Sequence, residues 1–140
     1  MQGLFLEELS VGQSAELTRV VGAADIDAFA AVTGDNNPVH LDAAFAATTS
    51  FGERIAHGML SAGYISAVIG TTLPGSGAIY LSQTLRFKRP VKIGDAVTAR
   101  ATITDIDTAK ARVTLATVCL VNAKPVVEGE AVIMVPRKDA

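Results

Sequence analysis

The sequence predicts one α+β domain, in which an antiparallel sheet of about five strands wraps around one long central helix. Two observations lead to this prediction: apolar residues keep helical spacing in the first half of the chain, and they alternate with polar residues in the second half. No repeat or low-complexity linker divides the 140 residues, of which 49% are apolar and 19% charged. Such a composition suits one core, so we expect a single domain over residues 1–140.

The first half of the chain alternates helical segments with polar turns. A strand is expected at Gln13–Val21, followed by a helix at Ala24–Thr33 with its apolar residues on one face. Gly34 is placed to end this helix, since glycine adopts the left-handed conformation at little cost. A turn rich in Asp and Asn comes next, and Asp42 can cap a short helix at Ala43–Thr48.

The segment His57–Thr71 is the longest helical candidate. Its apolar residues keep helical spacing, small residues cover the remainder and no charged side chain interrupts it, which predicts a buried helix. Polar segments at 92–95 and 105–110 then separate stretches of period-two alternation. This alternation predicts antiparallel strands at Ile79–Phe87, Val97–Thr104, Val113–Val121 and Val126–Val135.

Charge and composition exclude several classes of function. The net charge is −2 and no run of Lys and Arg stands out, which argues against a nucleic-acid partner. No apolar stretch reaches the ~20 residues that span a membrane, and the N-terminal segment lacks the features of a signal peptide. The single cysteine, Cys119, is expected to be a buried, inert thiol. We therefore expect a cytoplasmic protein, with neither metal nor nucleotide cofactor because no matching motif occurs.

The residues that can carry chemistry concentrate in the run from Asp35 to His40, which reads D-N-N-P-V-H. A carboxylate and an imidazole can exchange protons near neutral pH, which is the requirement for acid–base catalysis. Five residues of extended chain would separate their Cα atoms by up to ~17 Å, so the Asn-Pro turn is needed to bring both side chains to one water. Taken alone, the run could also be an ordinary Asx-Pro loop with a surface histidine.

This run resembles the D-x-N-P-x-H signature of the MaoC-like, (R)-specific enoyl-CoA hydratases. The similarity extends to five further segments, 43–49, 57–60, 79–81, 87–91 and 94–95. The similarity covers almost the whole chain. Within the family, the chain resembles the short, single-domain bacterial hydratases that supply polyhydroxyalkanoate synthesis. The resemblance implies the hot-dog fold, a homodimer, an acyl-CoA thioester substrate and no cofactor.

The resemblance also implies roles for individual residues. Asp35 and His40 bind the water that adds to trans-2-enoyl-CoA to give (R)-3-hydroxyacyl-CoA, and it stays open which of them removes the first proton. Asn37 holds the turn or orients the pair. Gly58 offers its backbone N–H to the thioester carbonyl at the start of the long helix, where unpaired N–H groups suit an oxyanion, although tight helix packing is an alternative. His57 could cap the helix or form a local hydrogen bond, and no catalytic role is expected for it.

Four further residues are candidates for binding substrate. Ser66 falls at the family's position for a serine that lines the acyl pocket, with simple helix packing as the alternative. Arg86, Lys88 and Arg89 end a strand with three positive charges that suit the phosphates of CoA, unless they form only a solvated strand face. Rival functions are a dehydratase for acyl-carrier-protein or branched acyl-CoA substrates, a hot-dog thioesterase and a non-catalytic acyl-CoA-binding module.

Overall fold

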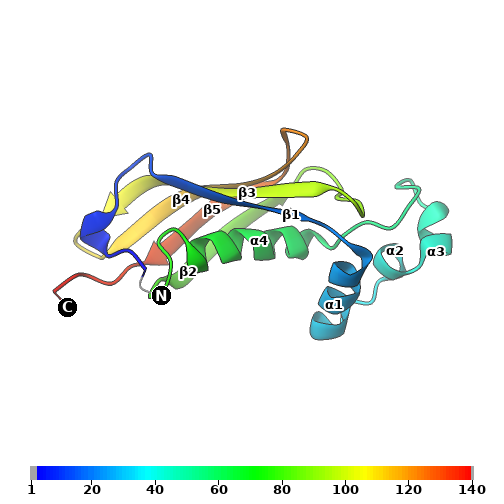
Figure 1. The fold of residues 1–140 in the computed structure, drawn as a ribbon, viewed down its shortest axis with the longest axis horizontal. Coiled ribbons are helices and arrows are strands. Elements are labelled where there is room, and N and C mark those ends of the chain that lie inside the picture. The colour runs from blue at the N-terminus through cyan, green and yellow to red at the C-terminus, as the bar shows by residue number, and fades with distance from the viewer. Residues whose placement is uncertain (1–2, 140) are drawn as a thin grey trace.

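A five-stranded antiparallel sheet forms the body of the molecule in the computed structural model, which describes residues 3–139 (Figure 1). The strand order is β1-β3-β4-β5-β2, and β1 and β2 are therefore the edges. The strands are β1 Ser14–Val20, β2 Ile79–Phe87, β3 Ala96–Asp107, β4 Arg112–Val121 and β5 Lys124–Met134. The prediction of an α+β protein with about five antiparallel strands is confirmed.

One long helix packs on this sheet, and three short ones lie apart from it. The helices are α1 Ala23–Thr33, α2 Pro38–Leu41, α3 Ala43–Ala47 and α4 Gly58–Thr71, after a 3₁₀ turn at Leu6–Glu8. Helix α4 runs along one face of the sheet, where it contacts β1, β3, β4 and β5 (Figure 1). The core lies between them, because the inward residues of α4 and of alternate strand positions are buried, among them Ile65, Val68, Ile69, Val97, Ile103, Leu115 and Ile133.

The sheet covers α4 from one side and does not enclose it. Ile65 and Ile69 are buried against the sheet, whereas Gly63, Ser66 and Gly70 are exposed on the other side of the helix. The expected wrapping of the sheet around this helix is therefore seen on one side of α4 only. The physical reason is that the outward residues of α4 are small. They expose little apolar surface, so the sheet does not have to cover that side of the helix.

Two local features differ from the sequence-based expectation. The segment expected as a polar turn before Asp42 contains the short helix α2, which begins at Pro38 and has Asn37 as its N-cap. Proline favours the first helical turn, since its φ angle is already helical and its missing N–H is not needed there. Strand β3 continues to Asp107 through a register shift between Ile103 and Asp105, so the break expected at 105–110 is shorter.

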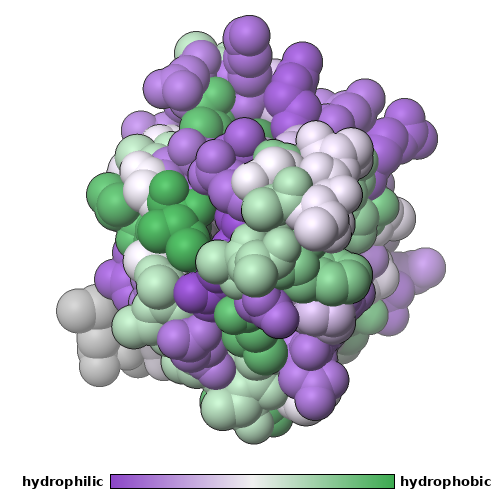
Figure 2. Space-filling view, turned by 90° about the vertical axis from the view of Figure 1, so that its right-hand side faces the viewer, coloured by the Kyte–Doolittle hydropathy of each residue, from purple (hydrophilic) through white to green (hydrophobic). Residues whose placement is uncertain are grey.

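Helices α1, α2 and α3 gather at one end of the molecule, next to the start of α4 (Figure 1). Seen from that end, hydrophobic residues form separate patches among hydrophilic ones (Figure 2). No helix within residues 3–139 has the length and apolar character needed to cross a membrane. This arrangement brings the motif on the α1–α2 loop and on α2 to the N-terminus of the long helix.

Candidate active site

The loop that carries the motif is held by its own side chains. Gly34 ends α1 with a φ of 81°, in the left-handed region. The Asp35 N–H donates to Thr33 Oγ1 at 3.1 Å, and Asp35 Oδ1 accepts from the Asn37 N–H at 3.4 Å. Asn37 Oδ1 in turn accepts from the Val39 N–H at 3.3 Å, as a helix N-cap does. These bonds shape a tight turn between the two acid–base side chains of the motif.

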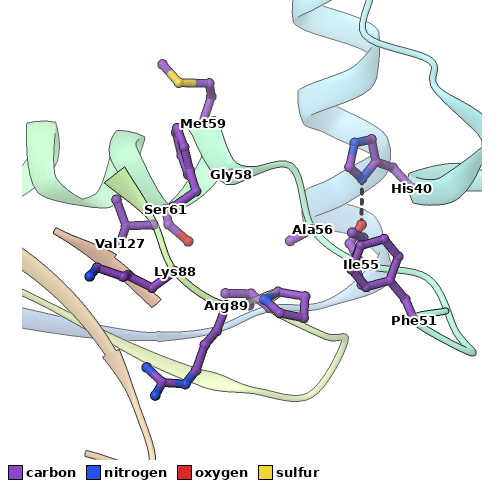
Figure 3. A pocket seen from close by; sticks show the side chains of 13 residues that line it. His40, Phe51, Ile55, Ala56, Gly58, Met59, Ser61, Lys88, Arg89 and Val127 are labelled. Atoms are coloured by element: carbon purple, nitrogen blue, oxygen red, sulfur yellow. Dashed lines mark hydrogen bonds between the residues drawn. The ribbon is translucent and has the colours of Figure 1, made fainter. Parts of the chain in front are cut away.

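His40 projects from α2 and is fixed through both its ring and its backbone. Its Nδ1 lies 2.8 Å from the carbonyl oxygen of Ile55 (Figure 3). A carbonyl only accepts, so Nδ1 donates and Nε2 remains as the free ring nitrogen. Arg54 Nε donates to the His40 carbonyl at 2.6 Å, and Nη2 of the same arginine pairs with Asp27 of α1 at 2.8 Å. Sequence analysis did not single out Arg54, because no local pattern indicates that one residue will contact both α1 and α2.

Asp35, His40 and His57 meet at the junction of α2 and α4. One side-chain nitrogen or oxygen from each of the three lies within 4.8 Å of the others. Asp35 is exposed, His40 is partly buried and His57 is 2% exposed. The structure therefore brings the two motif side chains close enough for one water to contact both.

A pocket of about 520 Å³ opens beside this cluster (Figure 3). It lies between the start of α4 and the segment that follows β2. Apolar side chains form most of its wall, and the lining residues include His40, Phe51, Ile55, Gly58, Met59, Ser61, Phe87, Lys88, Arg89 and Val127. Its size and its few polar groups are typical of a site for a small organic ligand.

Gly58 is the first residue of α4 and borders the pocket. A Cβ atom at this position would lie 2.6 Å from two ring carbons of Phe87. A side chain at this position would therefore require the Phe87 ring to move aside. No side chain caps this helix terminus, whose N-cap is His57. Unpaired N–H groups and the positive end of the helix dipole thus border the pocket, where they favour a developing negative charge.

The three predicted cations divide between two places. Lys88 and Arg89 line the pocket, where Lys88 pairs with Glu128 at 3.1 Å and Arg89 Nη1 donates to the Pro125 carbonyl at 2.6 Å. Arg86 does not line it and instead borders a separate groove of about 460 Å³ together with Glu128. Two of the three predicted residues therefore line the pocket.

The structure does not bring Ser66 into the pocket of the single chain. Ser66 is exposed on the outward side of α4, and the serine that lines the pocket is Ser61, which is 1% exposed (Figure 3). The signal that could have found Ser61 is its spacing, since it follows Gly58 by one helical turn and so shares its face.

Comparison with known proteins assigns the chain to a family. Residues 7–124 match the family described as MaoC like domain. The chain belongs to the MaoC-like domain family. It is 52% identical over 134 residues to an (R)-specific enoyl-CoA hydratase of Rhodospirillum rubrum, covering 96% of this chain and 93% of the relative.

Two solved structures resemble this MaoC-like chain closely. The R-hydratase PhaJ1 of Pseudomonas aeruginosa, in the unliganded form, has a TM-score of 0.93 and 55% identity, over 97% of this chain and 88% of its own. The (R)-hydratase of Aeromonas caviae involved in PHA biosynthesis has a TM-score of 0.91 and 48% identity, over 93% and 99%. These similarities confirm the hot-dog fold that the motif resemblance implied.

The histidine cluster of the MaoC-like chain does not suit one metal ion. An imidazole binds a metal in the plane of its ring, so two histidines share an ion only where their ring planes meet at it. The rings of His40 and His57 are stacked, with centroids 3.9 Å apart and planes 28° from each other. Planes this close to parallel do not meet within bonding distance of both rings, so the two imidazoles are poorly placed to share one ion.

Cys119 lies under α4 and takes no part in the site. Its Sγ donates to the carbonyl of Ser61 at 3.3 Å, and the side chain is fully buried. Burial raises the pKa of the thiol from its ordinary value of 9.0 to about 12, because the buried thiolate is poorly solvated. The prediction that this thiol is buried is confirmed, and its inertness stays a prediction.

Proposed function

We propose that this chain is a hydro-lyase that adds water to trans-2-enoyl-CoA thioesters and forms (R)-3-hydroxyacyl-CoA, with dehydration as the reverse reaction. The observation that carries the proposal is that side-chain atoms of Asp35 and His40 lie within 4.8 Å of each other, and that His40 lines an apolar pocket of about 520 Å³. The relatives at about 50% identity are hydratases of this specificity, which supports the same reaction here.

In the proposed mechanism, Asp35 and His40 hold one water between them. The oxygen of this water bonds to C3 of the enoyl group, one of its protons passes to the pair, and the pair delivers a proton to C2. His40 exchanges its proton through Nε2, because Nδ1 is bound to the Ile55 carbonyl. The Gly58 N–H stabilises the negative charge that develops on the thioester oxygen during attack, and Asn37 maintains the turn.

The substrate is an acyl-CoA in this proposal. The apolar wall of the pocket accommodates the acyl and pantetheine chains, and Lys88 and Arg89, which also line it, bind phosphate groups. Arg86, outside the pocket, adds positive charge along the same strand end. We further infer that the reaction takes place in the cytoplasm and feeds polyhydroxyalkanoate synthesis, since the Aeromonas caviae relative is described as involved in that process.

We also propose that the protein is a homodimer. Support comes from a face that the single chain leaves open, which consists of the outward side of α4 around Gly63 and Ser66 and the edge strand β2. Large apolar residues on that strand are exposed, namely Ile79 at 55%, Leu81 at 41% and Phe87 at 53%. A second copy would cover this open face, and Ser66 would then lie against the partner.

The decisive experiment incubates the purified protein with crotonyl-CoA and follows enoyl absorbance, free CoA and product chirality. We expect loss of absorbance, no free CoA and the (R) product. Release of CoA without hydration would identify a thioesterase. Ligand binding without turnover would identify a binding module. A strong preference for matched carrier-protein thioesters would support the dehydratase alternative.

A further inference from the structure

His57 makes three specific contacts at the site although the sequence motif assigns it no part. Its Nε2 lies 2.8 Å from the backbone carbonyl oxygen of Asp35. Its ring stacks on that of His40 at a centroid distance of 3.9 Å, and it contacts the ring of Phe29 at 4.6 Å. As the N-cap residue of α4, it also precedes Gly58 directly. One side chain thus contacts both members of the acid–base pair.

The hydrogen bonds of the His57 ring are not those expected of a residue that only fills space. The Asp35 carbonyl can only accept, so Nε2 carries the proton and Nδ1 is a bare acceptor in the neutral ring. Nδ1 is buried and has no hydrogen-bond partner among the described residues. A phenyl ring would occupy the same space without leaving a buried nitrogen unpaired. The retained imidazole therefore points to a use for its donor at Nε2.

The two links act on different members of the pair. The bond to the Asp35 carbonyl anchors the loop between α1 and α2, which is otherwise exposed at Asp35 and Asn37. The stacked ring restricts the plane of His40, whose Nδ1 is also bonded to the Ile55 carbonyl. Together they set the separation of the carboxylate and Nε2 of His40.

We infer that His57 is a positioning residue, which orients Asp35 through its Nε2–H and His40 through its ring face. The inference rests on the proposed hydration reaction and adds a residue to its machinery. His57 does not line the ligand pocket, so it acts through the pair and not on the substrate. Its loss should therefore lower kcat and leave KM close to the wild-type value.

Two substitutions separate the two links. His57→Gln keeps an N–H at the place of Nε2 and removes the aromatic stack, whereas His57→Phe keeps the stack and removes the donor. We expect each to lower kcat for crotonyl-CoA by about 10- to 100-fold with KM nearly unchanged, and His57→Ala to be worse than either. Both conservative variants should therefore retain more activity than His57→Ala. If His57 only filled space, His57→Gln would show no such partial rescue.

Thr117→Val is the matched control. Thr117 is a buried polar residue like His57, with 2% exposure and a hydrogen bond from Gln83 Nε2 at 3.0 Å, but it lies outside the ligand pocket. Its substitution should lower thermal stability and leave kcat unchanged. A fall in kcat for Thr117→Val equal to that for His57→Gln would overturn the inference, since general destabilisation would then explain both.

A second measurement does not depend on turnover. The chain has two histidines, so the nitrogen resonances of the imidazole rings are assigned by comparing the wild type with His57→Gln. We expect His57 to carry its proton on Nε2 and His40 on Nδ1 in the wild type, and the His40 resonances to shift and broaden in both His57→Gln and His57→Ala. Unchanged His40 resonances would overturn the inference even if the wild type hydrates crotonyl-CoA. An inactive wild type would overturn the proposed function alone, because the nitrogen resonances still report the positioning.

Discussion

Backbone carbonyls orient both histidines of the site. The Ile55 carbonyl accepts from Nδ1 of His40, and the Asp35 carbonyl accepts from Nε2 of His57. Because a carbonyl cannot donate, each bond selects one tautomer without placing a charge next to the ring. Nε2 of His40 is thereby left available toward Asp35, and the pair needs no third ionised residue to orient it.

The acid–base pair can be tested by Asp35→Asn and His40→Gln. Neither amide can take a proton from water, so each substitution should lower turnover of crotonyl-CoA by about 100- to 10,000-fold. The fold should survive because Asp35 is exposed and His40 only partly buried. Circular dichroism and thermal melting provide the control, and near-normal turnover by either folded variant would remove that residue from the assigned pair.

The close approach at Gly58 leads to a second prediction. In Gly58→Ala the new methyl group would press on the Phe87 ring, so we expect stability to fall by about 1–3 kcal/mol and activity to fall with it. The double variant Gly58→Ala with Phe87→Leu should recover much of the stability, because the smaller side chain can move aside. Thermal melting and kcat/KM are the measurements. If Gly58→Ala alone were as stable and active as the wild type, the contact with Phe87 would not restrict this position.

At the scale of the elements, the segment before α4 connects the short helices. Arg54 pairs with Asp27 of α1 and donates to the His40 carbonyl of α2, and its side chain is 16% exposed. The neighbouring Ile55 carbonyl receives the His40 ring. Consecutive residues of one segment therefore hold both the backbone and the ring of His40, which makes the position of α2 depend on this segment.

Arg54→Met tests this connection. The substitution keeps the length of the side chain and removes the donor to the His40 carbonyl, so we expect kcat to fall by about 10- to 100-fold. Asp27→Asn is the matched control, because Asp27 is 61% exposed and its ion pair contributes little in solvent. Equal losses in the two variants would show that the ion pair, and not the bond to His40, is what matters.

The packing of α4 on the sheet can be followed through Cys119. Its pKa is about 12 in the folded chain, so we expect slow labelling by iodoacetamide at pH near 9 and fast labelling after unfolding. The folded pKa lies above the unfolded value, so the stability due to the neutral thiol is complete below about pH 9 and declines as the pH rises toward 12. Cys119→Val has no thiol to ionise, so its stability should not decline for this reason as the pH rises. Rapid labelling of the native protein would show that α4 does not seal the thiol.

At the scale of the whole molecule, helix and sheet bury only one face of each other. The core residues of α4 face the sheet, whereas Gly63 and Ser66 remain exposed together with much of the edge strand β2. An edge strand with exposed apolar residues is available for pairing with another chain. The proposed dimer follows from this open face and from the symmetry that most homo-oligomers share.

Ser66→Arg tests the dimer. A long charged side chain on the outward side of α4 should prevent a second copy from covering that face, so we expect sedimentation to report one chain of 14.5 kDa instead of twice that mass. Ser10→Arg, in an exposed segment far along the chain from α4, is the control and should keep the wild-type mass. A Ser66→Arg variant that stays dimeric would place the interface elsewhere.

Local patterns predicted most of the fold. The alternation of apolar residues located all four strands of the second half, and β2 has the predicted bounds Ile79–Phe87. The predicted helix at His57–Thr71 differs from α4 by one residue, since His57 is its N-cap. Such patterns locate strands and helices well because the spacing of apolar residues differs between the two and follows the side of the element that faces the core.

The sequence by itself determined the strands, the longer helices and the family resemblance, and it predicted the Asp35–His40 pair, because each depends on residues that are near one another along the chain. Only the tertiary structure decided that Ser61 lines the pocket while Ser66 faces outward, since this depends on which side of α4 the sheet covers. It likewise brought Arg54 and His57 to the motif loop from 14 and 22 residues away. Contacts over such separations arise from packing and leave no periodic signal in the local sequence.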